Sequence, residues 1–228
     1  MRFMSWTAAI VAALGLMAAV PNGARADTTF TLGTAGTLPA GNYGTVNVTS
    51  IDNNTLQVSV TLSGTNHFAN TGIDAGFAFN LNGFGTITVS NISAPGTTAV
   101  WSPLNTSGGT TTAGSIGMDG AGDFQYALSF IYPGNPNPPG NTDGASLTFN
   151  IAATNLGLNT ANVTGVAADI CTLGPNNNNN CSTGGQTGAV VGTPSAVPAP
   201  IMGAGLPGLI AACAGLLVFA RRRRQKFA

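Results

Sequence analysis

The chain of 228 residues carries almost no charge along most of its length. Between Asp27 and Pro200 it contains no lysine, arginine or glutamate, and seven aspartates make this region about −7 at neutral pH. Nucleic acids and anionic lipid surfaces are bound through lysine and arginine, so neither is an expected partner of this region. The same absence excludes a lysine Schiff base and an arginine clamp for phosphate.

Histidine and cysteine are also scarce, which limits catalytic and metal sites. His67 is the sole histidine, and no nucleophile motif accompanies it. Cys171 and Cys181 lie ten residues apart around a turn-prone loop. In an exported protein this spacing predicts a disulfide, with free thiols as the alternative. A zinc site would need further ligands, and no histidine or cysteine lies nearby to provide them.

Asp119 and Asp123 are the only closely spaced carboxylates. Together with backbone carbonyls they could bind calcium, but the EF-hand pattern is missing and Asp119-Gly120 is also a favourable turn sequence. We therefore predict no metal, no cofactor and no catalytic residue, and expect a protein that is not an enzyme.

Residues 1–26 have the composition of a secretory signal peptide. Arg2 provides the basic n-region, residues 6–20 the apolar h-region, and Ala24 and Ala26 the small residues of the cleavage site. A transmembrane anchor is the alternative, but about 15 apolar residues are fewer than the roughly 20 that span a bilayer. We expect signal peptidase to remove this segment, so that the mature chain begins at Asp27.

Residues 27–188 contain several runs in which apolar and polar side chains alternate strictly. The clearest run alternates Leu56, Val58, Val60 and Leu62 with Thr55, Gln57, Ser59 and Thr61. Alternation of this kind is typical of antiparallel sheets with one buried face, and turn-forming residues separate the runs. The sequence predicts an exported all-β domain, an antiparallel β-sandwich of about seven to nine strands. A β-solenoid is the alternative, but no fixed repeat period supports it.

Residues 189–200 contain three prolines and no alternation, which predicts an extended linker. Residues 201–220 carry no charge and are long enough, at about 30 Å as a helix, to span a bilayer. A buried core helix fits poorly with the basic tail that follows (221–228), which begins with Arg221, Arg222, Arg223 and Arg224. The positive-inside rule places that tail in the cytoplasm and the β domain outside. Five residues in the span, four glycines and a proline, weaken it as a helix, a property that favours proteolysis over permanent anchoring.

This three-part end of the chain resembles the PEP-CTERM sorting domain. The likeness rests on a short proline motif (Val197, Pro198, Ala199 and Pro200), the glycine-rich span and the arginine cluster, about the last 32 residues. Ala199 stands where the family name implies glutamate. The resemblance implies an exported protein of a Gram-negative bacterium, passing through the inner membrane to the cell surface or medium. It also implies a membrane sorting enzyme of the exosortase type as partner, and a link to exopolysaccharide.

Two functions of the β domain follow as hypotheses. The first is a noncatalytic envelope or extracellular-matrix protein of a biofilm, which would associate with itself or with polysaccharide because its sheet edges lack protective lysine. The alternative is a carbohydrate-binding module or adhesin with a defined sugar site. Its stacking ring would be one of Trp101, Tyr126 and Tyr132, although core packing competes for the first two.

Overall fold

The computed structural model describes residues 27–34, 36–71, 75–118, 120–132, 141–153, 157–173, 181 and 185–195. These residues are all-β, as predicted, with sixteen strands and one short 3₁₀ helix, η1 (Thr160–Asn162). No helix within these ranges is long and apolar enough to cross a membrane. The predicted signal peptide, sorting motif, transmembrane helix and arginine cluster all lie outside the described residues.

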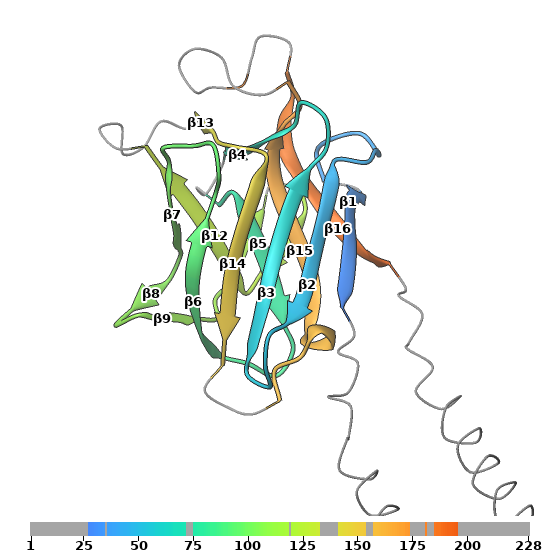
Figure 1. Ribbon diagram of the computed structural model, residues 1–228. Coiled ribbons are helices and arrows are strands. Elements are labelled where there is room, and N and C mark those ends of the chain that lie inside the picture. Colours follow the sequence, from blue (N-terminus) through green and yellow to red (C-terminus); the bar gives the residue numbers. More distant parts are fainter. Residues whose placement is uncertain are drawn as a thin grey trace, which may run out of the picture. The chain divides into compact units, whose positions relative to one another are not determined.

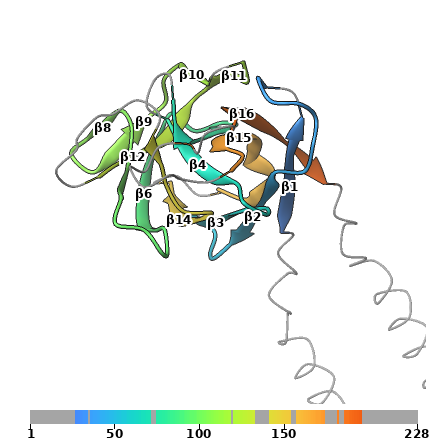
Figure 2. The same cartoon turned by 90° about the horizontal axis from the view of Figure 1, so that it is seen from above.

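Fourteen strands form one antiparallel sheet that curls around the core (Figures 1 and 2). Its front layer, as seen in Figure 1, consists of β1 (Thr28–Thr34), β2 (Gly44–Ser50), β3 (Thr55–Leu62), β14 (Ser146–Ala152) and β6 (Thr86–Ser93). Its back layer consists of β16 (Thr187–Ser195), β15 (Val163–Cys171), β5 (Phe77–Leu81), β12 (Tyr126–Ile131) and β7 (Val100–Pro103).

The remaining strands are short. Four belong to the large sheet: β4 (His67–Asn70) and β13 (Asn141–Thr142) beside β15, and β8 (Thr106–Ser107) and β9 (Thr110–Thr112) beyond β6. A separate hairpin pairs β10 (Ile116–Met118) with β11 (Gly122–Phe124).

The front layer has the alternation that the sequence predicts. Along β3 the side chains of Leu56, Val58, Val60 and Leu62 are buried, while those between them are exposed or half-buried. β2 and β14 repeat this pattern in register with β3. One face of this layer is therefore core and the other is outer surface.

The back layer is buried on both faces, which alternation alone did not reveal. β12 and β15 are buried along most of their length, and the rings of Tyr126 and Phe130 in β12 belong to the main core. On the other face, small side chains form a second cluster with apolar residues of the β10–β11 hairpin: Ala75, Ala78, Ala127, Ala167 and Ala189 with Ile116, Met118 and Phe124. Alanine suits this face because it lets the hairpin approach the sheet closely.

The two layers meet in one core of aromatic and aliphatic side chains. Phe149 of the front layer packs against Phe77 and Phe79 of the back layer, with ring centroids 5.8 and 5.7 Å apart. These side chains are shielded completely or almost completely from solvent. Burial of such rings is the main source of stability in a domain with few ionic groups.

The prediction of a sandwich with about seven to nine strands is wrong in two respects: the structure has more strands, and its two layers are not separate sheets. Two layers face each other, but β1 pairs with β16 and makes them one continuous sheet. The structure has more strands than predicted because it includes several of only two or three residues. These short strands consist mostly of polar residues and glycine and contain no long alternating run, so the sequence did not predict them. Backbone pairing, rather than apolar patterning, defines them.

The predicted linker, 189–200, is also wrong in its first part, because Ala189–Ser195 lie in β16. Gly192 explains why the pattern was hidden: a side chain there would meet Val166 Cγ2 at 2.3 Å and Phe30 Cβ at 3.1 Å. At Gly188 a Cβ would meet Thr37 Oγ1 at 1.9 Å. Close packing on both faces demands small residues, so the strand resembles a linker in composition.

Candidate binding cavity

A cavity of about 240 Å³ lies beside β4 and β13. It is smaller than the roughly 300–1,000 Å³ of pockets for drug-sized ligands, so it has room for one small group. The lining comes from the start of β4, the β6–β7 connection, the end of β12 and the β13–β14 connection: His67, Gly96, Thr97, Thr98, Tyr132, Thr142, Asp143 and Gly144.

Backbone pairing between β4 and β13 sets the position of Asp143 in this cavity. Thr142 lies opposite Ala69, and the Asp143 amide donates to the Phe68 carbonyl at 2.8 Å. The Phe68 amide in turn donates to the Gly144 carbonyl at 3.1 Å. Both backbone groups of Phe68 in β4 thus bond to this segment, one to Asp143 and one to Gly144, and they fix its position.

The Asp143 carboxylate is buried, with only 2 % of the residue exposed. A buried carboxylate is costly unless hydrogen bonds or cations compensate it, and residues 27–200 contain no lysine or arginine. Trp101 Nε1 donates to Oδ2, and the Tyr132 hydroxyl lies 3.4 Å from Oδ1. The indole N–H of Trp101, a neutral donor, therefore takes the place of the missing cation.

Trp101 is part of an aromatic cluster behind the cavity. Its ring lies edge-on to Phe68 at 5.1 Å and tilted over Phe130 at 4.7 Å. Gly76 leaves space for this cluster, since a Cβ there would lie 2.8 Å from Trp101 and 3.0 Å from Phe130. The packing fixes the indole N–H in the direction of Asp143.

Tyr132 lies half-buried at the edge of this cluster, and its hydroxyl donates to the Thr142 carbonyl at 2.6 Å. Burial raises the pKa of Tyr132 above its ordinary value of 10.0, and Asp143 raises it further through its charge and hydrogen bond. A hydrogen bond with Thr97 lowers this pKa in part. The phenol is consequently protonated at neutral pH and acts as a hydrogen-bond donor.

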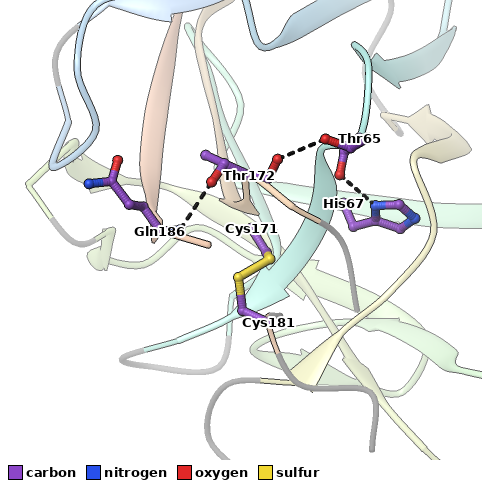
Figure 3. Close-up of a disulfide and its surroundings, with 6 residues drawn as sticks. All are labelled: Thr65, His67, Cys171, Thr172, Cys181 and Gln186. Atoms are coloured by element: carbon purple, nitrogen blue, oxygen red, sulfur yellow. Dashed lines mark hydrogen bonds between the residues drawn. A yellow bond between two sulfur atoms is a disulfide. The ribbon is translucent and has the colours of Figure 1, made fainter. Parts of the chain in front are cut away.

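His67 also lines the cavity, and it lies next to the disulfide (Figure 3). Its Nδ1 is 3.0 Å from the Thr65 carbonyl, which can only accept, so Nδ1 carries a proton. Thr65 Oγ1 donates to the Thr172 carbonyl at 3.0 Å and links this turn to the end of β15.

The predicted disulfide is present: Cys171 and Cys181 are joined, with their Cα atoms 5.6 Å apart. Cys171 lies opposite His67 in the β15–β4 pairing and is fully buried. The bond therefore ties the chain that follows β15 to the wall of the cavity.

Replacing both cysteines by alanine is expected to lower the free energy of unfolding by about 2–3 kcal/mol, because the unfolded chain gains loop entropy. Urea denaturation of the oxidised protein and the double variant measures this difference. Reduction of the unchanged protein should cause a similar loss. Ready alkylation of both thiols without reductant would refute the disulfide.

The other sequence-predicted candidates have different environments. Trp101 and Tyr126 are only 7 % and 1 % exposed, so both are core residues and neither is a stacking platform. The Tyr126 hydroxyl donates to the Phe84 carbonyl at 2.8 Å, and burial raises its pKa. Of the three proposed rings, only Tyr132 lines the cavity.

The calcium hypothesis receives no support from the described residues. Asp123 is exposed on β11, whereas Asp119 lies outside the described ranges. No group of three or more histidine, cysteine or acidic side chains within those ranges is placed to hold a metal ion.

The sequence did not single out Asp143, Thr97 or Thr98 as site residues. Asp143-Gly144 reads as an ordinary turn, and the two threonines lie in an irregular connection. The available signal was charge: a carboxylate in a region without cations must either be solvated or find neutral donors. Only the fold shows that Asp143 is buried and accepts a hydrogen bond from a neutral donor.

No family model, curated protein or solved structure matches the chain. The chemistry of the cavity must therefore be inferred from its own residues. Hydroxyl groups, one imidazole and one phenol surround a carboxylate that is already hydrogen-bonded, and no cation is present in the described lining. This set suits a small, uncharged, hydroxyl-rich group better than phosphate or an organic acid.

Proposed function

We propose that the protein is a noncatalytic component of the cell envelope or extracellular matrix, exported and then sorted by a PEP-CTERM-like C-terminal signal. The observation that carries the proposal is the order of three segments at the end of the chain. A proline motif at Val197–Pro200 is followed by an apolar glycine-rich span and by four arginines. The N-terminal signal peptide and the C-terminal transmembrane helix belong to this proposal.

Properties of the β domain support export and a matrix role. A disulfide persists in oxidising compartments outside the cytoplasm. The domain is rich in threonine, asparagine and glycine, and its low charge suits prolonged contact with neutral polymers. The noncatalytic assignment is supported by the residue types, because residues 27–200 contain no lysine, arginine or glutamate and only one histidine.

A second candidate function is recognition of one sugar unit in the cavity. It is favoured by the position of Tyr132, which lines the cavity beside hydroxyl groups of Thr97 and Thr98. Saturable binding on a glycan array that is lost on Tyr132→Ala would support this function. Concentration-dependent assembly without a ligand would favour a purely structural matrix protein.

Truncation of the chain after Ser195 tests the sorting signal. The shortened protein should still be exported and folded, because it retains the whole of β16, which ends at Ser195. Its amount on the cell surface should fall by about tenfold or more, since the membrane stop is removed. Quantitative immunoblots of periplasm, membrane, surface and medium measure the change.

A matched control replaces the four arginines at 221–224 by lysine, which retains the positive charge that fixes orientation. This variant should enter the inner membrane as the unchanged chain does. An unaltered surface level of the truncated protein would contradict the proposed signal.

A further inference from the structure

The outer face of the front layer, continued by the adjoining strand β16 of the back layer, carries a regular array of uncharged polar side chains. Because β16, β1, β2, β3, β14 and β6 pair in register, their outward side chains form rows across the strands. Strands in a sheet lie about 4.7–4.9 Å apart, and successive rows about 6.5–7 Å apart. The array is therefore a lattice whose two spacings the backbone fixes.

Three rows make up this array, which we call the threonine face. The first row crosses five strands and contains Thr193, Thr31, Thr45, Thr61 and Ser146. The second crosses six strands, over roughly 24 Å, and contains Ser195, Thr29, Asn47, Ser59, Thr148 and Ser93. The third contains Thr49, Gln57, Asn150 and Ser90. Every one of these residues is exposed or half-buried.

Hydrogen bonds between neighbouring strands help to order the face. Thr29 Oγ1 donates to Asn47 Oδ1 at 2.9 Å, and the hydroxyls of Thr31 and Ser195 lie 3.5 Å apart. Threonine is also restricted at χ1 by its branched β-carbon, so little rotamer freedom is lost when a partner binds. The face therefore presents its donors and acceptors in a largely preformed arrangement.

The composition of the face limits what can bind to it. Protein surfaces designed for solubility carry about 25–35 % charged residues, whereas none of these three rows contains a charged side chain. No aromatic ring lies in the rows, so recognition by ring stacking is absent there. The face can therefore bind a partner only through hydrogen bonds from its hydroxyl and amide groups. Each such bond replaces a hydrogen bond with water, so its net contribution to the binding free energy is small.

We propose that the threonine face binds an extended neutral polysaccharide. Such a chain presents hydroxyl groups at every ring, and contacts that are individually weak become effective when many form on one polymer. An anionic polysaccharide is disfavoured because the region from Asp27 to Pro200 carries about −7 and has no basic residue. The inference rests on the proposed matrix role, since it names the polymer class that the exported domain would meet.

The test is a binding isotherm of the mature protein, purified from the surface or medium, on amorphous cellulose as a neutral β-glucan. Alginate serves as the anionic comparison. Ser59→Glu combined with Thr148→Glu places two charges on adjacent strands in the second row. The matched control is Thr164→Glu, on an exposed position of β15 outside the face.

We expect the protein to bind cellulose and the paired glutamates to weaken that binding by about tenfold or more, with the control within about twofold. Thr45→Val with Thr61→Val removes two paired hydroxyls but keeps the β-branched shape, so it should fold normally and bind roughly threefold more weakly. Circular dichroism establishes that each variant is folded.

Three results would overturn the inference: no binding to cellulose, equal loss in the Thr164 control, or alginate bound as tightly as cellulose. A dimer that the paired glutamates dissociate would instead assign the face to a second copy of the chain. Sorting is measured separately by fractionation, and these substitutions leave residues 196–228 unchanged. Failure of the glucan experiment can thus be distinguished from failure of the proposed function.

Discussion

Trp101→Ala is expected to lower the free energy of unfolding by about 5 kcal/mol. Loss of a buried tryptophan typically costs about 3–5 kcal/mol through lost burial and the remaining cavity. Here the ring also packs edge-on against Phe68 and over Phe130. The substitution further removes the indole donor to Asp143, leaving a buried carboxylate with one donor fewer, a change that is strongly destabilising.

Trp101→Phe separates these two effects. It keeps most of the ring packing but removes the Nε1 donor, so we expect a loss of about 2–3 kcal/mol. Asp143→Asn should cost about 1 kcal/mol or less, because the amide oxygen can still accept from Trp101 while the buried charge disappears. Combining the two substitutions should therefore cost less than the sum of the single changes.

Chemical denaturation of the unchanged protein, Trp101→Phe, Asp143→Asn and the double variant measures the coupling between the two residues. Strict additivity of the two conservative substitutions would contradict the hydrogen bond between Trp101 and Asp143 as a stabilising contact. A loss of only about 1 kcal/mol for Trp101→Ala would contradict the buried position of the ring.

Phe149→Ala is expected to destabilise the domain by about 3–5 kcal/mol. Phe149 is fully buried and contacts Phe77 and Phe79 across the two layers. The void left by its ring lies between two hydrogen-bonded layers that cannot easily approach each other, so the upper part of this range applies. For a domain of this size the melting temperature should fall by roughly 10–15 °C.

Thr164→Ala provides the comparison, because Thr164 is exposed on β15. This change should alter the free energy of unfolding by about 0.5 kcal/mol or less. Similar melting temperatures for the two variants would show that the layers do not meet at Phe149.

The front layer could be predicted from sequence because its burial follows a simple rule. Leu56, Val58 and Val60 face the core while their neighbours face outward, and such a two-residue period is readable in a single chain. The pairing of Thr61 with both Thr45 and Ser146 could not be read in this way. Register between strands depends on contacts distant in sequence, and no local pattern encodes it.

The back layer and the cavity could not be predicted for a related reason. Ala167 and Ala189 face a hairpin that covers the sheet from outside, so small residues there indicate close packing and not exposure. Asp143 and Asp169 are each only 2 % exposed, although aspartate is normally a surface residue. Asp169 accepts a hydrogen bond from the Thr71 amide at 2.7 Å. Neutral donors for both carboxylates come from distant segments, and only tertiary structure brings them together.

We propose that the C-terminal segment is a sorting signal, present during transit and then removed. Intact-mass measurement of the protein from the cell surface and medium tests it most directly. We predict a product that begins at Asp27, ends near Val197–Pro200, contains the Cys171–Cys181 disulfide and lacks every lysine and arginine of the chain. A surface or medium product that retains Arg221 to Ala228 would contradict this account.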